Sequence, residues 1–112
     1  MSDRKFLISF DAKTDCKNKD FLTLYEALFK LDGTNLTEND FFQFLKQEKK
    51  WAVVDTKEFQ SLCFMRALAK KIQEAISAKF EKTVQINVDE TSHDILINDK
   101  VVKNYDEIVK AI

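Results

Sequence analysis

Asp11 is the residue of this chain that is best placed to do chemistry. It follows residues 5–10, where aromatic and β-branched side chains alternate with others, and such alternation predicts a strand. A carboxylate at a strand end lies at the rim of a sheet, where it can hold a divalent cation or simply end the strand in a polar loop. Asp11 is therefore the candidate metal ligand and catalytic residue. The candidate cofactor is Mg²⁺, and the alternative is that the protein binds no cofactor. Asp15 and Asp20 lie nearby, but a loop position and a helix N-cap account for them.

The histidine and the two cysteines form no catalytic motif. His93 is the only histidine and lies in a segment predicted to turn, so we expect a solvated side chain. A catalytic triad or a two-histidine metal site cannot form within one subunit. Cys16 and Cys63 lie far apart without a CxxC partner, so neither a zinc site nor a redox motif is supported. Cys63 falls on an apolar helical stripe, where a thiol behaves as a small hydrophobic group.

Composition narrows the class of protein. The 112 residues are 45% hydrophobic, enough for a single domain over residues 1–112. The formal net charge is −1, and Arg4 and Arg66 are the only arginines, which disfavours sequence-specific reading of nucleic acid. The single glycine, Gly33, excludes glycine-rich phosphate loops. The sequence shows no secretion signal and no apolar run of membrane-spanning length, so we expect a cytoplasmic protein without a membrane partner.

Helical spacing of apolar residues predicts two main helices. One covers residues 20–32 and ends before Gly33, which can adopt the left-handed C-cap conformation. The other covers residues 59–80, with Asp55 and Glu58 as a capping pair at its start.

Shorter predicted elements surround the long helix. Residues 37–48 fit both a helix and a strand, and the helix is slightly favoured. A hairpin follows the long helix, and a short helix behind an Asn104 cap ends the chain. The predicted strands after residue 50 are residues 51–54, 84–88, 95–97 and 101–102, and the terminal helix covers residues 105–112.

This order of elements predicts an α+β fold. It fits a ferredoxin-like sandwich, in which two main helices cover one face of an antiparallel sheet. The hairpin and the short helix at the C-terminus are additions to that arrangement. Many functions share this fold, so the fold alone does not assign one.

The N-terminal part resembles a known family. The segments LISFD and FLTLYEALFKL, with the polar turn between them, are similar to the opening of the small CRISPR-associated adaptation nuclease family and its toxin–antitoxin relatives. The segment WAVVDT resembles that family's third strand leading into its second helix. The resemblance implies a homodimer in which Asp11 lies at the interface and two copies share a divalent metal. It also implies a nucleic-acid-associated protein, either a metal-dependent ribonuclease or another nuclease.

Phenylalanine supports a second hypothesis. The chain has ten phenylalanines, and Phe29, Phe42 and Phe64 fall off the apolar stripes of their helices. Off-stripe rings favour an interface with a second copy or with another protein, the alternative being a fuller core. A lysine-rich turn before residue 51 could contact nucleic acid, although neighbouring acidic residues favour a solvated turn. The alternative function is therefore a non-catalytic interaction module, such as an antitoxin, adaptor or inhibitor, that binds a protein through an aromatic surface.

Overall fold

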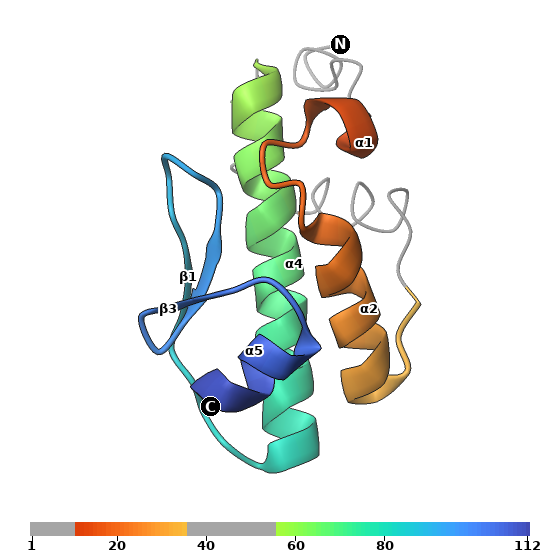
Figure 1. Ribbon diagram of the computed structural model, residues 1–112, viewed down its shortest axis with the longest axis vertical. Helices are drawn as coiled ribbons and strands as arrows, with labels where there is room; N and C mark the ends of the chain where they lie inside the picture. The colour runs from red at the N-terminus through yellow and green to blue at the C-terminus, as the bar shows by residue number, and fades with distance from the viewer. Residues whose placement is uncertain (1–10, 36–55) are drawn as a thin grey trace, which may run out of the picture.

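Two helices that run in the same direction form the centre of the molecule (Figure 1). The computed structural model describes residues 11–35 and 56–112. Helix α2 (Phe21–Asp32) lies beside the long helix α4 (Lys57–Phe80), and the single turn α1 (Ala12–Asp15) packs near the start of α4. These bounds confirm the two main helices predicted from apolar spacing.

The ends of α2 and α4 are set by local capping. Gly33 has φ of 77° and donates its N–H to the carbonyl of Phe29, as predicted for a left-handed C-cap. At the start of α4, Thr56 is the N-cap, and its hydroxyl accepts the N–H of Phe59 at 3.1 Å. The predicted capping pair of Asp55 and Glu58 is therefore wrong in its first member. Thr56, the residue after Asp55, occupies the N-cap position instead, and its hydroxyl accepts the N–H of the third residue of the helix.

The sheet is an antiparallel meander that follows α4. Its strands β1 (Ile86–Val88), β2 (Ile95–Ile97) and β3 (Lys100–Val102) pair in chain order, with Ile95 opposite both Val88 and Val102. Side chains alternate between the faces of a strand, so Ile95, Ile97 and Val102 point together into the core and are buried. The predicted hairpin is confirmed, although its first strand begins at residue 86.

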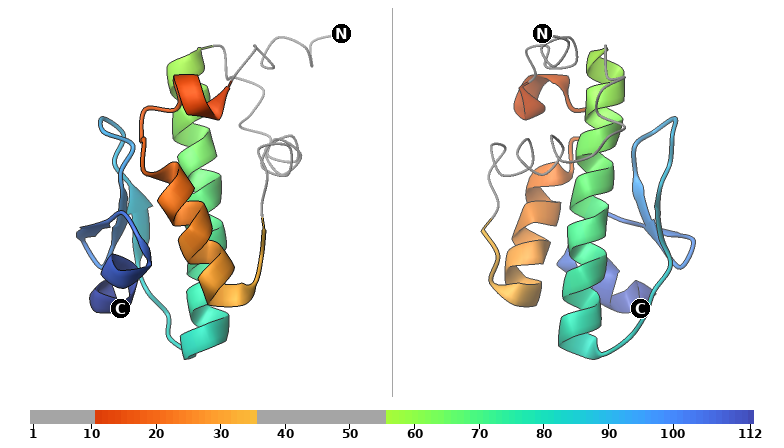
Figure 2. Two further views of the ribbon diagram at one scale, coloured as in Figure 1. Left: turned by 45° about the vertical axis from the view of Figure 1, so that its right-hand side comes forward. Right: turned by 180° about the vertical axis from the view of Figure 1, so that it is seen from behind.

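Helix α5 (Tyr105–Ala111) closes the described domain. Asn104 caps it, accepting the N–H of Glu107 at 3.0 Å as predicted. Strand β1 contacts α4, so the sheet forms one layer and α2 and α4 form the other (Figure 2). Helix α5 contacts both β3 and α2 and so joins the two layers. The described domain is therefore an α+β fold with a three-stranded antiparallel sheet. The predicted strands at residues 5–10 and 51–54, and the ambiguous residues 37–48, lie outside the described residues.

The core lies between the two central helices and the sheet. The ring of Phe64 is fully buried and meets the rings of Phe21 and Tyr25 edge-on, with centroids 5.9 and 6.1 Å away. The interface prediction therefore does not hold for Phe64, which instead bears out the alternative of a fuller core, because α2 also covers this side of α4. Phe29 is exposed as the same prediction required, and Phe42 lies outside the described residues. The largest buried side chains are Phe64, Leu24, Leu28, Met65, Leu68, Ile72, Ile76, Ile95, Ile97 and Ile108.

Candidate functional site

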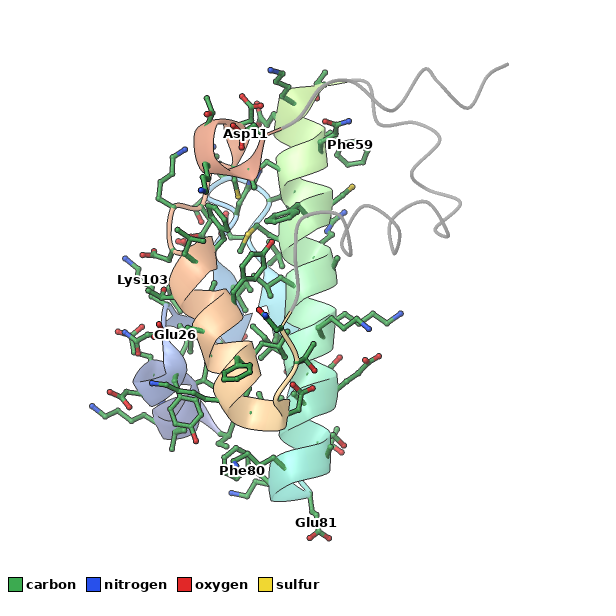
Figure 3. All side chains as sticks on the ribbon, turned by 90° about the vertical axis from the view of Figure 1, so that its right-hand side faces the viewer. Asp11, Glu26, Phe59, Phe80, Glu81 and Lys103 are labelled. Carbon is green, nitrogen blue, oxygen red and sulfur yellow. The ribbon has the colours of Figure 1, made fainter. Side chains whose placement is uncertain are left out.

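Asp11 caps the short helix α1 (Figure 3). Its carboxylate accepts the backbone N–H of Lys13 at 3.2 Å and the hydroxyl of Thr14 at 3.3 Å. Its own N–H donates to the carboxylate of Asp15 at 2.9 Å, which completes a reciprocal cap. The side chain is exposed, so the carboxylate can also be reached from solvent.

Asp15 carries the second carboxylate of this turn. Its Oδ2 lies 3.3 Å from Nζ of Lys57 at the start of α4. The hydrogen bond from the backbone of Asp11 lowers the pKa of Asp15 below its ordinary value, and Lys57 lowers that pKa further. Within residues 11–35 and 56–112, no three histidine, cysteine or acidic side chains meet as a metal-binding group. Asp20 occupies the N-cap position of α2, as predicted, but its side chain makes no capping hydrogen bond. The metal and catalytic roles of Asp11 stay predictions.

His93 is buried, so the prediction of a solvated turn residue is wrong. Only 1% of its surface is exposed, and its Nδ1 lies 2.9 Å from the hydroxyl of Ser61 on α4. The β1–β2 turn folds inward because the carboxylate of Asp89 accepts the N–H groups of Thr91 and Ser92. His93 then adopts φ of 64°, donates its N–H to the carbonyl of Asp89, and brings its ring onto α4. Burial lowers the pKa of His93 below its ordinary value, and Lys17 lowers that pKa further.

A buried polar cluster surrounds this ring, which we call the His93 cluster: Cys16, Asn18, Ser61 and His93. The amide of Asn18 donates to the carbonyl of His93 at 3.0 Å, and the hydroxyl of Ser61 accepts the N–H of Lys17 at 2.9 Å. The Sγ of Cys16 lies 3.8 Å from that hydroxyl. The cluster therefore joins the loop after α1, the helix α4 and the β1–β2 turn. Ser61 is fully buried, so its hydroxyl acts within the fold rather than on a substrate.

A cleft of about 250 Å³ opens beside His93, between the first turns of α4 and the β1–β2 turn. Phe59 and Leu62 supply apolar atoms, and Glu58 and Glu90 supply carboxylates. Glu90 also forms an exposed ion pair with Arg66 at 3.2 Å. Thr56 and His93 are the other described residues that line the cleft.

The outer face of α2 carries apolar side chains that the core does not use. Leu22 and Phe29 are 53% and 54% exposed, and they are two helical turns apart on the same face. Glu26 is exposed between them and makes no ion pair with any residue of the described ranges. We call Leu22, Glu26 and Phe29 the outer face of α2.

Sequence reasoning found only part of this arrangement. Phe29 could be identified because it falls off the apolar stripe of its helix. The His93 cluster could not be identified, because Asn18 and Ser61 contact a histidine 75 and 32 residues away. No helix of the described chain is both long and apolar enough to cross a membrane. Comparisons of the chain with protein-family models, with curated proteins and with solved structures found no match.

Proposed function

We propose that this protein is a small, non-catalytic interaction module that binds a protein partner through the outer face of α2. The observation that carries the proposal is the exposure of Leu22 and Phe29, each more than half accessible to solvent. Two large apolar side chains on one helical face can anchor a partner, because burying each ring or branched chain removes apolar surface from water. The opposite face of α2 is already occupied by the core.

The outer face also indicates the chemistry of the partner. Glu26 lies between the two apolar side chains, one turn from each of them along the helix. If a second copy docked through the same face, the two Glu26 carboxylates would meet near the symmetry axis, where like charges repel. We therefore favour a different protein, with an amphipathic helix whose apolar residues flank a lysine or arginine.

Selection from a displayed peptide library tests this proposal. The native chain is used as bait for random helical peptides, and the bound sequences are determined. We expect enrichment of peptides with two apolar residues on one face and a basic residue between them. The substitution Phe29→Glu should remove this binding, because it places a carboxylate where an apolar contact is needed.

The matched control is Ala78→Glu, which adds the same charge at an exposed position on α4. This variant should select the same peptides as the native chain. Peptides that bind both variants equally well, or no enriched pattern at all, would count against the outer face as the contact surface.

The metal-dependent nuclease is the second candidate, and the accessible carboxylate of Asp11 supports it. In that hypothesis the ferredoxin-like arrangement is completed by residues 5–10 and 51–54, and two copies share Mg²⁺ through Asp11. The metal would generate the attacking hydroxide and neutralise the phosphate. Cleavage of RNA and DNA with Mg²⁺ or Mn²⁺ tests this candidate, with light scattering to measure the homodimer. Activity that Asp11→Ala abolishes and Asp32→Ala preserves would favour it over the interaction module.

A further inference from the structure

We propose that the cleft beside His93 binds a single basic side chain, with arginine as the preferred ligand. The cleft lies between α4 and the β1–β2 turn. Figure 1 shows the sheet on the side of α4 away from α2. This second binding site goes beyond the proposed function, and it does not depend on the outer face of α2.

The lining of the cleft matches the two parts of a basic side chain. Phe59 and Leu62 are one helical turn apart on α4 and offer apolar contact to an aliphatic stem. Glu58 and Glu90 approach from the helix and from the turn, and offer carboxylates to the charged end. Glu58 makes no ion pair with another described residue, so its charge is available to a ligand.

His93 gives an independent indication of a ligand. The ring is almost completely buried and lines the cleft, and its Nδ1 is satisfied by Ser61. Its Nε2 has no hydrogen-bond partner in the described parts of the chain. Nε2 is not among the fully buried polar atoms without a partner, so it reaches the cleft and can accept a hydrogen bond from a donor that enters there. Because burial lowers the pKa of His93, the ring is neutral near pH 7 and does not repel a cation.

Size and charge favour a side chain over other ligands. A volume of about 250 Å³ is below the range of roughly 300–1,000 Å³ that small-molecule pockets occupy. A metal ion is disfavoured, because the carboxylates and the imidazole of the described chain do not converge as a metal-binding group. Arginine is preferred over lysine, since its planar guanidinium can stack on the ring of Phe59 while it bonds to a carboxylate.

Titration with blocked amino acids tests this site without any protein partner. Nα-acetyl-arginine amide is added to the full chain while NMR follows the imidazole of His93 and the methyl groups of Leu62. We expect saturable shifts at both residues, and weaker ones with the corresponding lysine amide. The citrulline amide has the same shape as the arginine amide but no charge, so we expect it to cause no saturable shift.

Variants locate the binding. Glu58→Gln and Phe59→Leu should each weaken binding of the arginine amide about two- to fivefold, as expected for an exposed ion pair and an exposed cation–π contact. Arg66→Gln should strengthen binding about twofold, because it releases Glu90 from its ion pair. Glu74→Gln, an exposed change further along α4, is the control and should leave binding unchanged.

Three results would overturn the proposal: no saturable shift, equal binding of the citrulline amide, or affinity that neither Glu58→Gln nor Phe59→Leu reduces. The amide spectrum of each variant shows whether it is folded. None of these outcomes depends on α2, so they leave the proposed protein-binding function to its own test.

Discussion

Two polar regions meet the N-terminal half of α4, and they are built in opposite ways. The turn around Asp11 is exposed, and the hydrogen bonds of Asp11 within the described residues join positions at most four apart, although Asp15 also pairs with Lys57 on α4. The His93 cluster is buried, and three of its hydrogen bonds join residues that are 32, 44 and 75 positions apart. The exposed turn is therefore a local structure, whereas the buried cluster fixes three segments against each other.

This difference has an energetic consequence. A polar group in water that loses its partner finds a solvent molecule instead, whereas a buried group that loses its partner keeps the full cost of desolvation. We therefore expect the His93 cluster to contribute more to stability than the Asp11 turn, although Asp11 is the candidate catalytic residue.

Asn18→Ala should lower the free energy of unfolding by about 2–3 kcal/mol. The substitution removes the Asn18 side chain, which is the hydrogen-bond partner of the buried carbonyl of His93 and of the half-buried N–H of Asp20. Urea denaturation measures the change. The exposed Asn87→Ala is the control and should alter stability by less than about 0.5 kcal/mol. Equal effects of the two substitutions would show that the cluster has no special energetic role.

Acid should weaken the cluster before it affects the turn. The folded pKa of His93 is lowered from 6.5, so as the pH falls below that value the unfolded chain takes up a proton that the folded chain does not. Stability should therefore fall as the pH is lowered from 7 towards 5. The charged groups near the ring are Lys17 and Arg66, which lower the pKa of His93, and Glu58 and Asp89, which raise it.

The carboxylates of Asp15 and Asp89 affect stability in a separate, lower pH range. The pKa values of Asp15 and Asp89 are lowered from 3.8, so their contribution to stability is present above that pH and is lost below it. His93→Asn keeps a residue that tolerates a positive φ and should flatten the curve between pH 7 and 5 only. Thermal unfolding at several pH values measures both windows. An unchanged slope in the variant would contradict the assignment to His93.

Asp11→Ala should lower the free energy of unfolding by about 1 kcal/mol, the usual cost of losing an N-cap side chain. Asp11→Asn keeps an oxygen for the N–H of Lys13 and should recover most of that loss. Chemical denaturation compares the two variants with the native chain. A loss as large as that of Asn18→Ala would remove the difference between the regions.

Phe29→Ser should change stability least, by less than about 0.5 kcal/mol, because the ring is exposed and supports no core contact. The matched buried change is Phe64→Ala, for which removal of a core ring costs about 3–5 kcal/mol. Chemical denaturation of both variants compares the free energy of unfolding lost at a surface position of α2 with that lost at a core position of α4. A large loss for Phe29→Ser would mean that its ring is part of the core.

The parts of the fold that depend on neighbouring residues could be predicted from the sequence. Apolar spacing located α2 and α4, Gly33 marked the end of α2, Asn104 marked the start of α5, and alternation located the hairpin. Each of these signals acts within a few residues of the chain.

The candidate sites depend on distant residues, and the sequence predicted them less well. His93 lies in a polar turn, so nothing near it indicated burial against Ser61. Phe64 falls off its stripe, and only the packing of α2 against α4 places it in the core. The exposure of Phe29 was predicted because it depends only on which face of α2 turns inward.

The most direct test of the proposed function is a charge reversal on the outer face of α2. Peptides are selected from the displayed library with the native chain and with Glu26→Lys as parallel baits. Since Leu22 and Phe29 are unchanged, both baits should select the same apolar spacing. The residue between the apolar positions should change from basic to acidic. Identical peptides from both baits would contradict the claim that this helical face chooses the partner.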